Sequence, residues 1–488
     1  MASRQHKPEW ELPSLRESHQ IPGIGKDFYG VQFYPYTEPG VDPVFAIVGG
    51  KHILICRPPA AENTKIEVTQ YCVDEETNKD KNGDDQEEDY YTCVWTKDFE
   101  TGDPLLCVAG LNATIKIINA LTGKLLRTLS GHGGEINDLV ISPTNPYILA
   151  SASNDLNVRI WSLDPAHVKQ PCAAILEGDG HREAVMSLTF HATSRYLLTG
   201  GVDHIINLNS QTRTLAPTNQ PESTTLTSPL RKSTKTFVAF YGDLILSKAA
   251  NENCIVLWSI NNFNSTNPLP TRSSAPTTHD AQRDTRSVFT TSSAKSTQYT
   301  RLLQFSIPDS EILFMRFSLF PGGLGMNPVL AFCNTGSKVF FWDMSRLEAY
   351  HDATADGGDI KDANTRPAFL NPFQHRNRVG AGGGGAVARL HMHRAASPAD
   401  SSSTGGDERE REREKEREKG RIDWEKSIKG WVKKYEINQP LESLDAHKEE
   451  VVKGLGFTGR YIAWSRDGQW CVVVGSAGVF ALLQRWGR

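Results

Sequence analysis

Three features that would place a chain in a specialised class are missing from this sequence. No apolar run of about 18 or more residues occurs, so no membrane-spanning helix is expected. The first ten residues, MASRQHKPEW, contain no apolar stretch, so the sequence predicts no secretory signal. The net charge of -4 over 488 residues lies far from the basic charge that is typical of proteins that coat nucleic acid.

Residue patterns that support metal or catalytic chemistry are missing as well. None of the eight cysteines forms a CxxC pair, so we expect no zinc site. Several cysteines stand in apolar segments such as CIVLW and AFCNTG, which favours buried free thiols in a reducing compartment. The chain has no GxSxG elbow, phosphate-binding glycine loop or Rossmann fingerprint. The sequence therefore predicts a protein that is not an enzyme and that carries no cofactor.

The length and composition allow either about three domains or one large repeat array with insertions. Hydrophobic residues make up 38% of the chain. This value lies below the average of roughly 45–50% for globular proteins, although that average also counts glycine. We therefore expect part of the chain to lie outside a packed core.

The clearest order in the sequence is an internal repeat that begins with Gly-His. One unit runs from His132 through LVIS, YILASAS and VRIWS, which are short β-type segments separated by turn residues. His132 precedes Asp155 by 23 residues, and His181 precedes Asp203 in the next unit by 22 residues. This Gly-His…Trp-Asp spacing is typical of the four-stranded blades of a β-propeller.

Weaker copies of the same pattern extend over the rest of the chain. Seven blades of about 43 residues need roughly 300 residues, which the chain can supply. The sequence therefore predicts an all-β fold, a seven-bladed WD-repeat β-propeller with long low-complexity insertions. Besides the two Gly-His units, strand-like segments of the further blades lie near 44–58, 91–120, 237–260, 314–344 and 461–486.

The residues outside the blades form a leader and several insertions. The longest insertion contains EREREREKEREKGR, which has no apolar face, so we expect disorder with local helicity there. The predicted division is a polar leader at 1–27, blades one to six at 28–349 with loop insertions at 73–89, 210–235 and 261–300, a low-complexity insertion at 350–446, and blade seven at 447–488.

The His, Asp and Trp residues of the repeat invite an acid–base role, but a structural role is expected. In WD-repeat propellers these residues form a buried, hydrogen-bonded chain that locks a blade. Blade three contains His132, Asp155 and Trp161, with Ser151 or Ser153 as the hydroxyl member. We assign these residues to stability.

Blade four carries a partial version of the same chain. His181, Thr199 and Asp203 stand at matching positions. Asn209 stands where Trp is usual, so this blade lacks the indole of the pattern. We assign His181 and Asp203 to stability as well.

The repeat register also predicts a cluster at one mouth of the central channel. The start of each inner strand lies four residues before a large apolar residue, and these starts form a ring. Aromatic faces attract a methylated ammonium by cation–π contact, and Asn or Arg can hydrogen-bond a peptide. In the alternative interpretation, the aromatics only cover apolar surface. The ring positions are Tyr29, Tyr91, Asn137, Met186, Leu313 and Arg460, with Phe314 one step further in.

Six segments of the chain resemble one known family. The segments FYGVQF, YYTCVW, GHGGEIN, GHREAV, GDLILSK and FMRFS occur in this order. Together they resemble the embryonic ectoderm development/extra sex combs family, the WD-repeat subunit of the Polycomb repressive complex. The resemblance covers most of the blade segments and none of the large insertions, and GDLILSK is specific to the family.

The resemblance implies an aromatic cage for a trimethylated lysine of the histone-3 tail. Leu313 stands where the family has Trp, which removes the best cation–π face from the cage. Asn137 matches a family residue that contacts the histone backbone, and Arg460 matches an arginine near the same peptide. The family's cage positions fall on Tyr29, Tyr91, Phe314 and Leu313.

The resemblance also implies the partners. A SET-domain histone methyltransferase subunit would lay an N-terminal helix on the opposite face of the propeller, and other Polycomb subunits would join the complex in the nucleus. Bound trimethyl-lysine would shift the catalytic subunit toward its active state, which requires different affinities for two states. No membrane contact and no direct sequence-specific DNA binding are implied.

Two other functions remain open at this point. A generic propeller adaptor, such as a substrate receptor of a ubiquitin ligase, would share the blades but not the cage or GDLILSK. An enzyme carried on a propeller is the least favoured, because the catalytic motifs named above are missing.

Overall fold

The computed structural model of this protein describes most of the chain. The chain divides into two compact units, Met1–Ser345 with Ile437–Arg488, and Arg346–Glu436. The described residues are 11–59, 64–79, 83–176, 181–210, 222–227, 236–269, 299–355, 360, 362, 366–370, 425–454 and 456–485.

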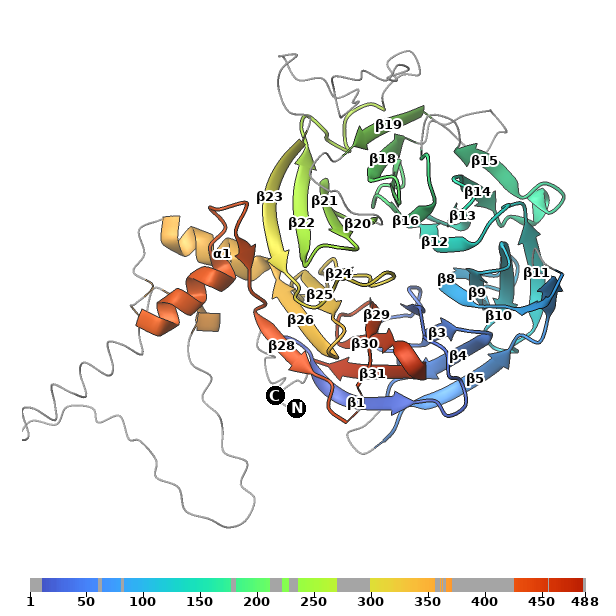
Figure 1. The fold of residues 1–488 in the computed structure, drawn as a ribbon, viewed down its shortest axis with the longest axis horizontal. Helices are drawn as coiled ribbons and strands as arrows, with labels where there is room; N and C mark the ends of the chain where they lie inside the picture. The colour runs from blue at the N-terminus through green and yellow to red at the C-terminus, as the bar shows by residue number, and fades with distance from the viewer. Residues whose placement is uncertain are drawn as a thin grey trace, which may run out of the picture. The chain divides into compact units, whose positions relative to one another are not determined.

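The larger unit is the predicted seven-bladed propeller (Figure 1). Seven sheets stand around a central channel, and consecutive strands of a blade pair antiparallel from the channel outward. Blades one to four are β2 (Gly30–Phe33), β3 (Phe45–Gly49), β4 (His52–Arg57) and β5 (Glu67–Val73); β8 (Tyr90–Lys97), β9 (Pro104–Gly110), β10 (Thr114–Asn119) and β11 (Leu125–Ser130); β12 (Ile136–Ser142), β13 (Asn145–Ser153), β14 (Val158–Ser162) and β15 (Cys172–Leu176); and β16 (Val185–Phe190), β17 (Tyr196–Gly201), β18 (Ile205–Ser210) and β19 (Glu222–Thr227).

The other three blades recruit strands from distant parts of the chain. A short parallel strand joins blade five, and an N-terminal strand completes blade seven. Blades five to seven are β20 (Thr236–Tyr241), β21 (Leu244–Ala249), β22 (Cys254–Ile260), β23 (Tyr299–Ser306) and β27 (Ser443–Leu444); β24 (Ser318–Phe320), β25 (Val329–Cys333), β26 (Lys338–Asp343) and β28 (Lys448–Val451); and β29 (Gly459–Trp464), β30 (Trp470–Gly475), β31 (Val479–Gln484) and β1 (Ser14–Gln20).

Two predicted boundaries are wrong at the point where the ring closes. The polar leader 1–27 contains β1, which pairs antiparallel with β31 and forms the outer strand of blade seven. Blade seven does not begin at residue 447, because β28 pairs with β26 and completes blade six. An outer strand is exposed on one side, so its sequence is polar and gives little strand signal.

The predicted insertions contain regular structure in part. The segment 73–89 is not simply a loop, since β6 (Thr77–Lys79) and β7 (Asp85–Glu87) form a hairpin. The segment 210–235 supplies β19, and 261–300 ends in the first residues of β23. The disorder expected for the charged run of the longest insertion falls on residues outside the described ranges.

The smaller unit contains short helices within the predicted insertion 350–446. Helix α1 (Met344–Ala355) leads into it, a single 3₁₀ turn follows at Ala368–Leu370, and residues 425–435 are helical. Tyr435 packs against both of the other segments: its ring centroid lies 5.5 Å from that of Tyr350 in α1 and 5.1 Å from that of Phe369 in the 3₁₀ turn.

Apolar residues of neighbouring blades form the core between the sheets. Strands such as β3 and β30 are buried along their whole length. All eight cysteines are free, and five of them are buried. Burial raises the pKa of Cys56 and Cys107 to about 12, so these thiols stay protonated at neutral pH.

A hydrogen-bonded chain locks blade three. Trp161 Nε1 donates to Ser151 Oγ at 2.8 Å, and Ser151 Oγ lies 2.6 Å from His132 Nε2. His132 Nδ1 lies 2.8 Å from Asp155 Oδ2. The hydroxyl member is therefore Ser151, whereas Ser153 donates to the Gly134 carbonyl.

Blade four contains the shorter version of this chain. His181 Nδ1 lies 3.0 Å from Asp203 Oδ1, and its Nε2 lies 2.8 Å from Thr199 Oγ1. Asn209 is buried at the position where Trp is usual. The histidines and aspartates of both blades thus make structural contacts.

Replacing Ser151 by Ala should lower the free energy of unfolding by about 1–3 kcal/mol, because the buried His132 and Trp161 nitrogens lose their partner. Urea unfolding measures this change. Ser130→Ala on the exposed side of β11 is the matched control and should change stability by less than about 0.5 kcal/mol. Equal stability of both variants would contradict the blade lock.

Asp155 should make the protein sensitive to acid. Burial disfavours its charged form, but hydrogen bonds from His132 and the Gly133 N–H outweigh burial and lower its pKa to about 2. Because the folded-state pKa is below the usual value of 3.8, the stabilisation is complete above that pH and is lost as the pH falls toward 2. Acid unfolding of Asp155→Asn should show a weaker dependence on pH in this window than the wild type.

Candidate functional site

The predicted ring positions lie at equivalent places in their blades. In four first strands the register with the second strand shifts at the start, and one extra residue is left between the pairs. A β-bulge of this kind redirects the side chain of the extra residue. These extra residues are Tyr91, Asn137, Met186 and Arg460.

Three aromatic rings meet at this mouth of the channel. The centroid of Tyr29 lies 5.7 Å from that of Tyr91 and 5.9 Å from that of Phe314. Tyr91 and Phe314 are 5.8 Å apart. The rings come from blades one and two and from the segment before β24 in blade six, and each is half-buried. A cation within about 6 Å of each ring would contact all three faces or edges.

Leu313 and Phe314 form the blade-six side of this cluster. Leu313 is 40% exposed, so an apolar side chain stands open to solvent beside the rings. Phe314 has a backbone φ of 57°, which is unusual for a bulky residue. A left-handed backbone of this kind costs energy and persists only when the surrounding structure fixes it.

Three carboxylates and one arginine lie near the rings. Burial and Asp27 raise the pKa of Tyr29. Burial, Glu135 and Asp89 raise the pKa of Tyr91. Both phenols are therefore neutral at physiological pH. The Arg460 guanidinium acts in the opposite direction on Tyr29 and partly offsets the carboxylates.

The two predicted peptide contacts are engaged within the protein. Asn137 is fully buried, and its Nδ2 donates to Asn154 Oδ1 at 2.7 Å and to the Val185 carbonyl at 2.8 Å. The Arg460 side chain is 15% exposed. Its Nη1 donates to the Leu313 carbonyl at 2.7 Å.

A buried ion pair below the cluster escaped the sequence analysis. Arg316 Nη1 lies 2.6 Å from Asp138 Oδ1, and Arg316 Nη2 donates to the Asn137 carbonyl at 2.5 Å. The sequence signal is a charged residue within each of two mainly apolar segments: Asp138 in NDLVIS and Arg316 in FMRFS. The pair joins blade three to blade six across the channel.

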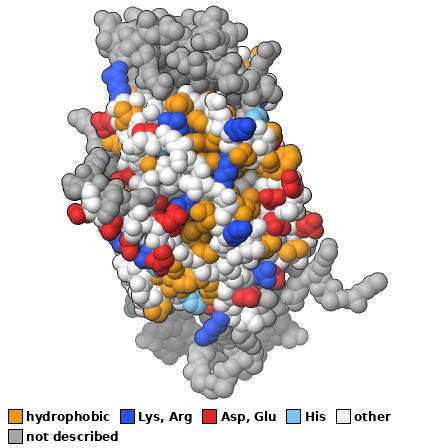
Figure 2. Space-filling model, turned by 90° about the vertical axis from the view of Figure 1, so that its right-hand side faces the viewer, with side chains coloured by type: hydrophobic (Ala, Val, Ile, Leu, Met, Phe, Trp, Pro, Cys, Tyr) orange, Lys and Arg blue, Asp and Glu red, His pale blue; other side chains and the backbone are white. Residues whose placement is uncertain are grey.

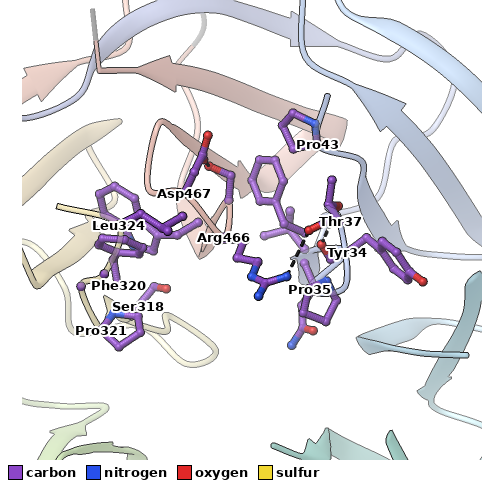
Figure 3. Close-up of a pocket in the computed structure, with 18 of the residues that line it drawn as sticks. Tyr34, Pro35, Thr37, Pro43, Ser318, Phe320, Pro321, Leu324, Arg466 and Asp467 are labelled. Carbon is purple, nitrogen blue, oxygen red and sulfur yellow. Dashed lines mark hydrogen bonds between the residues drawn. The ribbon is translucent and has the colours of Figure 1, made fainter. Parts of the chain in front are cut away.

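The opposite mouth of the channel contains a pocket of about 660 Å³ (Figure 3). Loops of blades one, six and seven line it. Arg466 reaches across and donates from Nη1 to the Thr37 carbonyl at 3.1 Å. The other labelled side chains are mostly apolar or aromatic: Tyr34, Pro35, Pro43, Phe320, Pro321 and Leu324, together with Ser318 and Asp467.

The side of the ring seen in Figure 2 shows no surface of a single charge. Basic, acidic and apolar side chains are interspersed there. A continuous basic stripe, as phosphate binding requires, is not visible on this face. Among the described residues, no helix is long and apolar enough to cross a membrane, and no group of three or more His, Cys, Asp or Glu residues could hold a metal ion.

Comparisons with known sequences support the assignment of WD-repeat blades. The WD domain, G-beta repeat, matches residues 123–162 and 171–208, which cover most of blades three and four. Polycomb protein EED of Chaetomium thermophilum is 38% identical over 98% of this chain and 97% of its own length. Polycomb protein esc of Drosophila melanogaster is 26% identical over 69% of this chain and 75% of its own length.

Solved structures show the same fold at matching length. A chain of "Crystal structure of an active polycomb repressive complex 2 in the basal state" is 35% identical, with a TM-score of 0.79 over 98% of this chain and 99% of that chain. A chain of "Structure of ctPRC2 in complex with H3K27me3 and H3K27M" gives the same identity, TM-score and coverage. This chain therefore belongs to the EED/esc family of Polycomb WD-repeat proteins.

Proposed function

We propose that this chain is a non-catalytic scaffold and histone-mark reader of a Polycomb-type histone methyltransferase complex. The observation that carries the proposal is the pairwise contact of Tyr29, Tyr91 and Phe314 at one channel mouth. These rings, with Leu313 beside them, would bind trimethyl-lysine of the histone-3 tail. The similar chain in a complex described with H3K27me3 supports this ligand.

The chemistry of the mouth fits a trimethylated ammonium better than a free amine. A trimethylammonium group cannot donate a hydrogen bond, so it gains little from water and much from aromatic faces. The carboxylates of Glu135 and Asp89 near Tyr91 add attraction for a basic histone tail. The charge of Asp27, in contrast, is paired with Arg460. An adaptor that reads another class of peptide would not need this combination of aromatic rings and carboxylates.

Asn137 and Arg460 remain predicted peptide contacts. Both side chains already make hydrogen bonds within the protein, so a peptide would have to exchange with those bonds. Asn137 Oδ1 is buried and has no hydrogen-bond partner among the described residues, which leaves it as the acceptor that the residue offers. A backbone N–H of the peptide is the matching donor.

The pocket at the opposite mouth supports the partner side of the proposal. Its aromatic and apolar lining, with the charged residues Glu38, Arg466 and Asp467, suits a peptide segment with apolar anchors. We infer that the SET-domain methyltransferase subunit places its N-terminal helix on this face, and that the assembly acts in the nucleus with other Polycomb subunits. Coupling between the two mouths requires different affinities for two states of the complex.

Tyr91→Ala should weaken binding of a trimethyl-lysine histone-3 peptide by about 1–2 kcal/mol or more, since one wall of the cage is lost. Calorimetric titration with methylated and unmethylated peptides measures the change. Phe99→Ala, at an exposed aromatic of blade two, is the matched control and should leave the affinity unchanged. Equal affinity of the wild type for both peptides would contradict the proposed function.

Leu313→Trp should tighten binding of the same peptide, because Trp provides the strongest cation–π face. We expect a gain of about twofold to thirtyfold, from roughly 0.5–2 kcal/mol per contact. The same titration measures it. An unchanged affinity would mean that residue 313 does not face the methylammonium group.

Leu324→Asp should reduce co-purification of the SET-domain subunit, because it places a charge in the apolar lining of the opposite pocket. Leu121→Asp is the control, since Leu121 is also exposed but does not line this pocket. Equal recovery of the subunit with both variants would place its binding site elsewhere on the chain.

A further inference from the structure

Asp27 and Arg460 form an ion pair that joins blade seven to blade one beside the aromatic rings. Arg460 Nε and Nη2 donate to Asp27 Oδ2 at 3.0 and 2.8 Å. The side chains are only 15% and 22% exposed, so water screens the pair less than it screens a surface pair. Two bonds to one carboxylate oxygen also fix the plane of the guanidinium.

The fixed guanidinium contacts two walls of the cage. Its Cζ lies 5.4 Å from the centroid of the Tyr29 ring, within cation–π range. Its Nη1 donates to the Leu313 carbonyl at 2.7 Å. Arg460 therefore joins the wall from blade one to the wall from blade six.

Phe314 lies between two backbone groups that Arg460 holds. The Leu313 carbonyl accepts from the guanidinium, and the Arg316 N–H donates to the Arg460 carbonyl at 2.8 Å. The left-handed backbone of Phe314, with φ of 57°, costs energy and persists only when its neighbours fix it. These two bonds lie on either side of the strained residue.

Asp27 also supports a second strained residue. Its Oδ1 accepts from the Ala477 N–H at 3.2 Å, and Ala477 has φ of 57° as well. The next residue after Asp27, Phe28, donates from its backbone to the Gly475 carbonyl at 3.0 Å. One carboxylate thus reaches the loop between β30 and β31 and, through Arg460, the segment of Phe314.

We propose that Asp27 is a positioning residue of the methyl-lysine cage. It orients the Arg460 guanidinium, and Arg460 holds the Leu313–Phe314 segment against Tyr29. This inference rests on the proposed function of the cage. It assigns specificity to a residue that is not one of the predicted cage positions, and it gives Arg460 a role in shaping the cage in addition to any contact with the peptide.

The test compares the affinities of variants for trimethylated and unmethylated histone-3 peptides. Asp27→Asn weakens the guanidinium contact, and Arg460→Lys keeps the charge but cannot reach Asp27 and Leu313 with one planar group. Each variant should reduce the preference for the trimethylated peptide about threefold to thirtyfold. Asp27→Glu keeps the carboxylate and should recover part of the preference.

Glu449→Gln provides the matched control. It removes the acceptor of the Lys338–Glu449 ion pair, whose N–O distance of 2.9 Å resembles that of the Asp27 pair but which lies on the outer edge of blade six. This variant should leave the preference unchanged. Circular dichroism and the unfolding temperature report whether each variant is folded, and Arg460→Lys replaces Asp27→Asn if the latter does not fold.

The outcomes separate the two hypotheses. If the wild type binds both peptides equally, the proposed function of the cage fails. If the wild type prefers the trimethylated peptide and the folded Asp27→Asn and Arg460→Lys variants keep that preference in full, the positioning role is overturned. A lower unfolding temperature with an unchanged preference would also overturn it, because the pair would then serve stability alone.

Discussion

The pairing of β1 with β31 is the contact on which the ring depends, because a blade is stable only between two neighbours. In six of the seven blades, the outer strand follows the first three strands in the chain. Blade seven instead takes its outer strand from Ser14–Gln20, before the first blade. The first and the last described strands, β1 and β31, therefore meet in one sheet (Figure 1). Closure of this kind protects the inner sheets from open edges.

The candidate site is a consequence of the closed ring. Tyr29, Tyr91 and Phe314 are separated by up to 285 residues in the chain, and they meet because the first strands of their blades start at one channel mouth. The site lies next to the seam of closure, where Asp27 accepts hydrogen bonds from Arg460 and Ala477 of blade seven. The geometry of the rings and the closure of the propeller are thus connected through a few polar contacts.

The two mouths of the channel lie at opposite ends of the first strands of the blades. The cage mouth is half-buried, aromatic and surrounded by carboxylates, which suits a methylated cation. The pocket at the opposite mouth has a mostly apolar lining, which suits a docked peptide segment. The buried pair of Arg316 and Asp138 ties blade six to blade three. In the proposed function, one face would hold the partner and the other would read the histone tail.

The sequence by itself determined the number of blades, the blade locks and the ring of strand starts. A repeat places equivalent positions of each unit at equivalent places in space. The spacing of His132 and Asp155 is therefore enough to predict a blade lock, and the alignment of Tyr29 with Tyr91 is enough to predict that both lie at one channel mouth. Only the tertiary structure decided that residues 14–20 close blade seven, that β28 belongs to blade six, and that Arg460 pairs with Asp27. Outer strands are polar and carry little pattern, and the Asp27–Arg460 contact joins residues 433 positions apart. Such contacts depend on how the ring closes, which no local pattern encodes.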